Sequence, residues 1–135
     1  MLTTVGTRIA FANRWVRLRE DAVRFPEGLE SVYTYIERPT YALLAAMEDG
    51  HLWMVEQYRH PLGMRSWELP MGIAPGGDSI PIEEGARIEL KEETGVTAAH
   101  WQRVGELAPA PALLAQTGVL FLATSLTRGE QALEA

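Results

Sequence analysis

Residues 85–96 read Gly-Ala-Arg-Ile-Glu-Leu-Lys-Glu-Glu-Thr-Gly-Val, and this stretch carries three glutamates, Glu89, Glu92 and Glu93. On a helix, positions i, i+3 and i+4 share one face, so the three carboxylates would converge. Like charges held together destabilise a helix unless a positive group lies among them, and a hard divalent cation with oxygen ligands suits that place. The alternative interpretation is an ordinary solvated acidic face.

The residues in front of this stretch favour the metal site. Residues 67–79 read Trp-Glu-Leu-Pro-Met-Gly-Ile-Ala-Pro-Gly-Gly-Asp-Ser, which predicts a short apolar strand followed by a glycine-rich loop. Glycine allows the backbone to approach a metal or a phosphate closely. We expect a helix over Pro81–Thr94, with Asp78 or Ser79 as its N-cap and Gly95 as its left-handed stop. The alternative is an ordinary strand–loop–helix connection.

Together these two stretches resemble the Nudix box, the signature of the Nudix hydrolase family. The matching residues are Gly72, Glu89, Leu90, Glu92, Glu93, Gly95 and Val96. The sequence departs from the pattern in three places. Asp78 stands where the family has its first glutamate, and Ile88 stands where it has an arginine. Two extra residues lie within 79–82. In the family that glutamate and arginine pair with each other. Apolar packing of Ile88 can be neutral for stability. Arg87 points to another side of the helix and is not expected to substitute.

The resemblance implies an α+β fold: N-terminal antiparallel strands and a Nudix-type mixed β-sheet sandwich with one main catalytic helix. The residue patterns agree with this class, because they predict strands over Trp15–Arg24, Val32–Ile36, Tyr41–Met47, Leu52–Tyr58, Val104–Leu107 and Val119–Ser125. The third and fourth of these flank Glu48-Asp-Gly50 and are expected to form a hairpin. A chain of 135 residues fits one domain, with an N-terminal strand region over 1–39 and a Nudix core over 40–135.

The charge and composition exclude several classes of protein. There are no cysteines, so no disulfide framework and no thiolate metal site is expected. The net charge of −6 argues against a broad nucleic-acid-binding face. It does not argue against a small phosphorylated ligand, because a bound metal reverses the local charge and a few arginines can complete an anion site.

No membrane segment is expected from the sequence. Arginines interrupt the N-terminal region at Arg8, Arg14, Arg17 and Arg19, and no stretch approaches the roughly 20 apolar residues of a membrane span. We therefore expect a cytoplasmic protein with no membrane partner.

Further residues resemble the ADP-ribose pyrophosphatase branch of the family: Gln57-Tyr58-Arg59, then Trp67-Glu68-Leu69-Pro70, and Pro111. By this resemblance Arg59 would contact the diphosphate or ribose phosphate, and Glu68 would support the metal or the substrate. Arg38 would reach across a homodimer formed by exchange of N-terminal strands. The alternative for each arginine is a solvated surface charge. Pro111 is flanked by alanines rather than by the branch's Ser and Gly, which leaves other nucleoside diphosphate sugars open as substrates.

The resemblance also implies a mechanism. Glu89, Glu93 and Glu92, with a backbone carbonyl of Met71 or Gly72, would hold Mg²⁺ or Mn²⁺. Water would then cleave the diphosphate of a nucleoside diphosphate sugar into a nucleoside monophosphate and a sugar phosphate.

The branch's remaining elements are not expected in this chain. In the branch, a glutamate-bearing loop that often supplies a general base, a further strand and a C-terminal helix follow the point where this sequence ends. Glu130 and Glu134 are candidates for a remnant base. The competing hypothesis is therefore a catalytically weak or silent module that binds a nucleotide sugar or a partner protein. The three glutamates oppose this hypothesis, because a silent module has no need of a costly acidic cluster.

Overall fold

The computed structural model describes residues 1–131, so the candidate base Glu134 lies outside the described residues. The chain divides into two compact units. Unit 1 contains Met1–Arg38 and Ala108–Gln116, and unit 2 contains Pro39–Leu107 and the chain from Thr117 onward. No helix within the described residues is long and apolar enough to cross a membrane.

Unit 1 is built on a sheet of antiparallel strands, to which a short parallel strand is added. In the described part of the chain its strand order is β1-β2-β3-β10. The strands are β1 (Thr3–Ala12), β2 (Arg17–Arg24), β3 (Glu30–Glu37) and β10 (Leu114–Ala115). The expected strands over Trp15–Arg24 and Val32–Ile36 are thus confirmed. β1 was not predicted as a strand of its own; its pairing with β2 shifts register twice, which interrupts the simple alternation that marks a strand in sequence.

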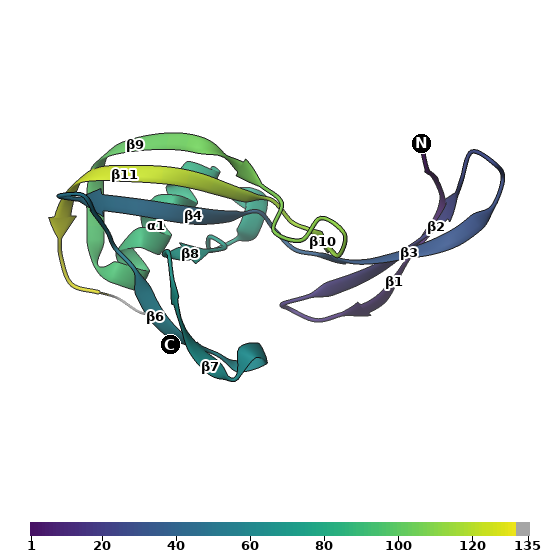
Figure 1. The fold of residues 1–135 in the computed structure, drawn as a ribbon, viewed down its shortest axis with the longest axis horizontal. Coiled ribbons are helices and arrows are strands. Elements are labelled where there is room, and N and C mark those ends of the chain that lie inside the picture. Colours follow the sequence, from purple (N-terminus) through teal and green to yellow (C-terminus); the bar gives the residue numbers. More distant parts are fainter. Residues whose placement is uncertain (132–135) are drawn as a thin grey trace. The chain divides into compact units, whose positions relative to one another are not determined.

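Unit 2 carries a mixed sheet with one α-helix on it among the described residues (Figure 1). The sheet order is β5-β4-β11-β9, and β8 also pairs with β4. These strands are β4 (Tyr41–Glu48), β5 (His51–Leu52), β8 (Met71–Gly72), β9 (Val96–Leu107) and β11 (Gly118–Arg128). β4 and β11 run parallel, whereas β9 and β11 run antiparallel. The expected α+β class with a mixed sheet and a principal helix is confirmed.

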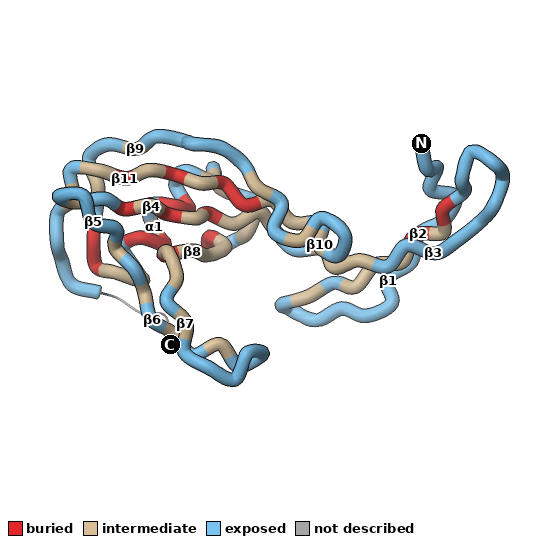
Figure 2. The backbone as a smooth tube through the Cα atoms, viewed as in Figure 1, coloured by how far each residue is buried: buried red, intermediate tan, exposed pale blue. Residues whose placement is uncertain are grey.

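The core of unit 2 lies between the helix α1 (Ile82–Thr94) and the sheet. Alternate residues of β4 and β11 turn toward α1, as the two-residue period of a strand requires. Figure 2 shows that the buried residues of unit 2 lie mainly along β4, β11 and α1. The buried members are Ala42, Leu44, Ala46, Ala86, Leu90, Val96, Val119, Phe121 and Ala123. Apolar burial along this face fixes the rotation of α1, and so decides which helix residues face the neighbouring loop.

The end of α1 agrees with the prediction, but its beginning differs. Gly95 adopts the left-handed conformation with φ 73°, and its N–H donates to Lys91 O, as a helix stop requires. The predicted side-chain N-cap is wrong, because Pro81 occupies the cap position and no side chain there accepts a cap hydrogen bond. The Asp78 carboxylate instead accepts a bond from Thr40 N–H.

The expected hairpin between Tyr41–Met47 and Leu52–Tyr58 is correct only at its turn. β5 pairs with the end of β4, but the chain then leaves this sheet. β6 (Val55–Arg59) pairs with β7 (Met64–Glu68) in a separate antiparallel hairpin. The turn between them is a short 3₁₀ helix (His60–Leu62), closed by Gly63 with φ 64°. A local glycine-closed turn therefore decided the pairing, which the strand pattern alone did not indicate.

Candidate active site

One face of α1 lies along the segment that begins with β8. Gly85, Glu89 and Glu93 stand four residues apart, so they share that face. Gly85 meets Ala74, Glu89 meets Gly72, and Glu93 meets Met71. Helix and segment therefore run in opposite directions with matched contacts. This arrangement places two of the three predicted metal-binding glutamates against the two predicted backbone ligands.

The contact between Glu89 and Gly72 depends on the missing side chain of the glycine. Glu89 is a buried acidic residue, 9% exposed. A Cβ added at Gly72 would lie 2.1 Å from Glu89 Oε2, far inside van der Waals contact. The backbone at position 72 can approach the carboxylate only because glycine stands there. The same holds where the helix meets Ala74, since a Cβ at Gly85 would lie 2.6 Å from the Ala74 Cβ.

Glu93 is a half-buried carboxylate at the C-terminal end of this face. Its Oε2 accepts a hydrogen bond of 2.9 Å from Met71 N–H. Burial raises the pKa of Glu93 above its ordinary value, and the charges of Glu68 and Glu92 add to the rise. The Met71 bond and the charge of Arg59 lower the pKa but do not cancel the burial. A cation beside Glu93 would therefore relieve an unfavourable buried charge.

Arg59 and Glu68 pair with each other beside this carboxylate. Arg59 Nε lies 2.9 Å from Glu68 Oε1, and Arg59 Nη2 lies 2.5 Å from Glu68 Oε2. The pair keeps the pKa of Glu68 below its ordinary value, chiefly through these hydrogen bonds. A guanidinium has five N–H donors, so Arg59 keeps donors for an anion while Glu68 fixes its orientation. The two residues come from facing strands, since β6 pairs with β7.

The remaining predicted substrate residues belong to unit 1. Arg38 is exposed, and its backbone N–H donates to Ala115 O at 3.4 Å. Pro111 is exposed on the segment Ala108–Gln116. The roles assigned to Arg38 and Pro111 stay predictions.

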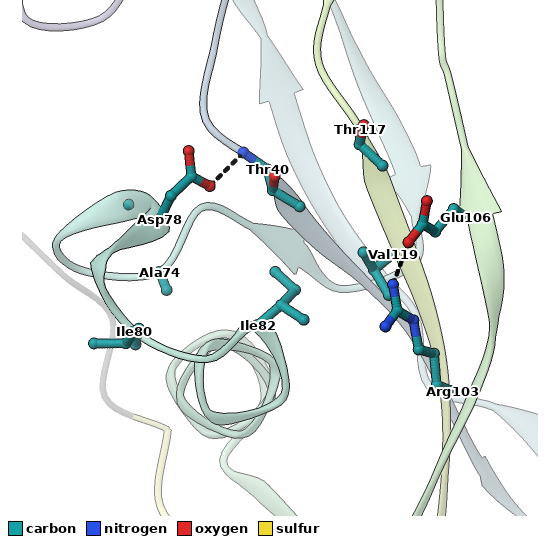
Figure 3. Close-up of a pocket in the computed structure, with 10 residues that line it drawn as sticks. Thr40, Ala74, Asp78, Ile80, Ile82, Arg103, Glu106, Thr117 and Val119 are labelled. Carbon is teal, nitrogen blue, oxygen red and sulfur yellow. Dashed lines mark hydrogen bonds and ion pairs between the residues drawn. The ribbon is translucent and has the colours of Figure 1, made fainter.

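A pocket of about 360 Å³ lies at the N-terminal end of α1 (Figure 3). Apolar and polar residues line it together: Thr40, Ala74, Gly77, Asp78, Ile80, Ile82, Arg103, Glu106, Thr117 and Val119. Asp78 Oδ1 accepts a hydrogen bond of 3.0 Å from Thr40 N–H across one wall. Across the pocket, Arg103 is ion-paired with Glu106. Thr40 could not be predicted as the partner of Asp78, because it contributes a backbone N–H rather than a side-chain group.

The carboxylates fit a hard divalent cation in their chemistry. Carboxylate and carbonyl oxygens are the ligands that Mg²⁺ and Mn²⁺ prefer. The absence of a side chain at Gly72 lets the Glu89 carboxylate lie directly against the backbone at position 72, where a Cβ would collide with it. Glu92 is half-buried and close enough to Glu93 to raise its pKa. Within residues 1–131, however, no group of three or more His, Cys, Asp or Glu side chains is already arranged to hold an ion.

Arg87 is engaged away from these carboxylates. Its guanidinium pairs with Glu83 at 2.6 Å and lies 4.8 Å from the centroid of the Trp101 ring. It therefore occupies a different side of α1, as the helical geometry predicts.

Comparison with known proteins decides the family. Residues 36–134 match the model of the NUDIX domain, and residues 2–36 match the nucleoside diphosphate sugar hydrolase N-terminal domain. This chain belongs to the NUDIX family. The resemblance found in the sequence is thereby confirmed, and the helix–loop contact described above joins Gly72 and Glu89, two of the residues that carried it.

Named relatives of this NUDIX chain cover most of its length. An ADP-ribose pyrophosphatase of Mycobacterium tuberculosis is 39% identical over 91% of this chain and 59% of its own length. A methanol dehydrogenase activator of Bacillus methanolicus is 31% identical over 96% of this chain and 69% of its own. An ADP-ribose pyrophosphatase of Bacillus subtilis is 30% identical over 92% of this chain and 66% of its own. The chain therefore spans about three-fifths to two-thirds of the length of these relatives.

A solved structure shares the fold. The crystal structure of an ADP compounds hydrolase superposes with a TM-score of 0.82 at 23% identity, covering 99% of this chain and 71% of that one. The likeness confirms the α+β fold of this chain.

Proposed function

We propose that this NUDIX chain hydrolyses the diphosphate of a nucleoside diphosphate linked to a sugar, of the ADP-ribose kind. The products would be a nucleoside monophosphate and a sugar phosphate. The observation that carries the proposal is the antiparallel contact of α1 with the β8 segment, which sets Glu89 against Gly72 and Glu93 against Met71. The names of two relatives and the description of the N-terminal family model support this substrate class.

The metal assignment belongs to the same proposal. Glu89 and Glu93, then Glu92, with a carbonyl of Met71 or Gly72, would hold Mg²⁺ or Mn²⁺. A bound divalent ion supplies charge neutralisation of phosphoryl oxygens and lowers the pKa of water. The raised pKa of Glu93 supports the assignment, because a half-buried carboxylate in need of positive charge is a favourable ligand.

The chain's own residues would hold and orient the diphosphate. Arg59 presents guanidinium N–H groups to the phosphate oxygens, while Glu68 prevents the arginine from rotating away. Water adds to one phosphorus, and the bridging oxygen leaves with the other phosphate. The half-buried setting of Glu93 limits the access of other water molecules to the reacting centre.

We also infer a homodimer formed through unit 1. β1 is an edge strand of its sheet and is exposed along its whole length. It carries Val5, Ile9 and Phe11 with 44, 47 and 55% exposure. An exposed edge strand with large apolar side chains is a favourable surface for pairing with another chain. A second copy is the partner that we propose.

The test is product release from ADP-ribose and a panel of nucleoside diphosphate sugars, with Mg²⁺ or Mn²⁺, for the wild type and Glu93→Gln. Turnover that Glu93→Gln abolishes supports the hydrolase and ranks its substrates. Turnover that survives Glu93→Gln unchanged would remove Glu93 from the mechanism.

The second candidate is a binding module without efficient turnover. It is favoured by the relative named as an activator of methanol dehydrogenase, a name that describes action on another enzyme. Absence of turnover on the whole panel, together with a melting temperature raised by ADP-ribose or Mn²⁺, would favour this module over the hydrolase.

A further inference from the structure

The loop between β8 and α1 is attached at one end to the beginning of β4 and at the other to the residue just before this strand. At its start, β8 pairs with β4, with Gly72 opposite Ala42. At its far end, Asp78 Oδ1 accepts the hydrogen bond from Thr40 N–H, visible in Figure 3. Two attachments only two residues apart, at Thr40 and Ala42, fix the loop against the start of β4.

The loop is stiff between these two attachments. Gly77 N–H donates to Ala74 O at 2.8 Å, and Ser79 Oγ donates to Gly76 O at 2.7 Å. Gly76 and Gly77 have φ values of 85° and 60°, a conformation that these glycines adopt without strain. Because the turn is bonded internally, a displacement at Asp78 is passed back to Ala74 rather than absorbed. Ala74 in turn packs closely against Gly85 of α1.

We propose that Asp78 is a positioning residue for the metal-binding carboxylates. Through Thr40 N–H it fixes the loop, so that Met71 and Gly72 meet Glu93 and Glu89 in register. The inference rests on the proposed function for its kinetic consequence, but not for its effect on metal affinity.

The bonding geometry predicts which property of Asp78 matters. Asp78 is exposed, and the described contact uses one oxygen as an acceptor of a backbone N–H. An amide oxygen accepts the same bond, so the charge is dispensable and the acceptor is not. Asp78→Asn should therefore behave as the wild type, whereas Asp78→Ala should not. Asp78→Glu keeps the charge but lengthens the side chain, so it should shift the loop.

The experiment measures kcat and KM for ADP-ribose, Mn²⁺ affinity by electron paramagnetic resonance, and the melting temperature of these three variants and the wild type. Glu27→Ala, which removes an exposed carboxylate in unit 1, is the matched control. We expect Asp78→Ala to bind Mn²⁺ about 10-fold more weakly and to lose on the order of 10-fold in kcat. We expect KM to change less than about 2-fold, since Arg59 is untouched. Asp78→Glu should lose less Mn²⁺ affinity and less kcat than Asp78→Ala. Asp78→Asn should keep its Mn²⁺ affinity and its kcat within about 2-fold of the wild type.

The outcomes separate the two proposals. Wild-type kcat and Mn²⁺ affinity in Asp78→Ala, with a lowered melting temperature alone, would overturn the positioning role and leave a structural brace. A wild type without turnover, whose Mn²⁺ affinity still falls in Asp78→Ala, would overturn the hydrolase and support the positioning role. A wild type with neither turnover nor Mn²⁺ binding overturns both. If Asp78→Ala does not fold, the comparison of Asp78→Glu with Asp78→Asn decides, and equal Mn²⁺ affinity in the two overturns the positioning role.

Discussion

The backbone of Gly72 lies directly against the carboxylate of Glu89, in the space that a side chain at position 72 would need. This contact joins the loop that begins at β8 to the helix α1, the two parts of the sequence that resemble the Nudix box. Because Glu89 is buried, its carboxylate has little freedom to move away from an added group. The glycine is therefore required for the shape of the site.

Gly72→Ala should disrupt the site through this contact. The added methyl group would collide with Glu89, and we expect a loss of about 10²-fold in kcat, with overpacking costing about 1–3 kcal/mol of stability. Gly105→Ala is the matched control, because a Cβ at Gly105 meets nothing within 4 Å. Steady-state kinetics and thermal unfolding check both. Equal kcat for the two variants would show that the Glu89 carboxylate moves without consequence.

Arg59→Lys should weaken substrate binding while leaving the fold intact. Lysine keeps the charge but loses the planar fork that engages Glu68 and a phosphate together. We expect KM for ADP-ribose to rise on the order of 10-fold, with a smaller change in kcat.

The control for this prediction is Arg65→Lys on the same hairpin. Arg65 forms an ion pair with Glu56 on the same hairpin, and Arg65 Nε lies 3.0 Å from Glu56 Oε2. The Arg65→Lys variant should leave the KM for ADP-ribose unchanged. The same KM for both variants would argue that Arg59 is a structural partner of Glu68 and does not contact substrate.

Asp21 should make unit 1 sensitive to acid. It is buried among hydrogen-bond donors, Thr7 Oγ1 at 2.6 Å, Arg19 Nε at 3.0 Å and the Tyr35 hydroxyl at 3.0 Å. The bond from Thr7, then those from Arg19 and Tyr35, hold the pKa of Asp21 below its ordinary value. A carboxylate with a lowered folded pKa stabilises the fold above its unfolded pKa of about 3.9 and loses this contribution as the pH falls through the folded pKa.

We therefore expect the melting temperature of the wild type to drop as the pH falls below about 4, and Asp21→Asn to show a flatter profile over that range. Glu27→Gln is the control, and it should follow the wild type. An Asp21→Asn profile parallel to that of the wild type would place the acid sensitivity elsewhere.

The proposed homodimer gives a direct prediction for β1. Phe11→Lys places a charge on the exposed edge strand, and edge lysines oppose strand pairing. We expect light scattering to give the dimer mass for the wild type and the monomer mass for Phe11→Lys. Circular dichroism should be unchanged, because Phe11 is 55% exposed. A wild type that is monomeric at micromolar concentration contradicts the proposal.

The sequence predicted the elements whose signals are local. The helix over residues 82–94 follows from its glutamate spacing, and its end follows from Gly95, which is the residue that a left-handed stop requires. The family and the α+β class followed from the same stretch. The candidate site residues on α1 and β8 came from the resemblance to the family motif, and their roles stay predictions.

Features that depend on distant backbone groups were not predicted. The predicted N-cap failed because Asp78 bonds to Thr40, 38 residues away, in preference to the helix. The predicted hairpin was wrong beyond Leu52, because β6 pairs with β7 and not with β4. Glycine lowers the stability of a helix interior, so Gly85 was a local sign of a close contact, which the structure shows with Ala74. The cytoplasmic location stays a prediction.

The most direct test of the central claim is the rate of AMP formation from ADP-ribose as Mg²⁺ is titrated, for the wild type beside Glu89→Gln and Glu93→Gln. The proposed site predicts no AMP without metal and saturable activation by Mg²⁺ in the wild type. It also predicts that each variant forms AMP more than about 100-fold more slowly, a larger loss than the 10–100-fold typical of groups that only support a ligand. Metal-independent AMP formation, or equal rates in all three proteins, would contradict it.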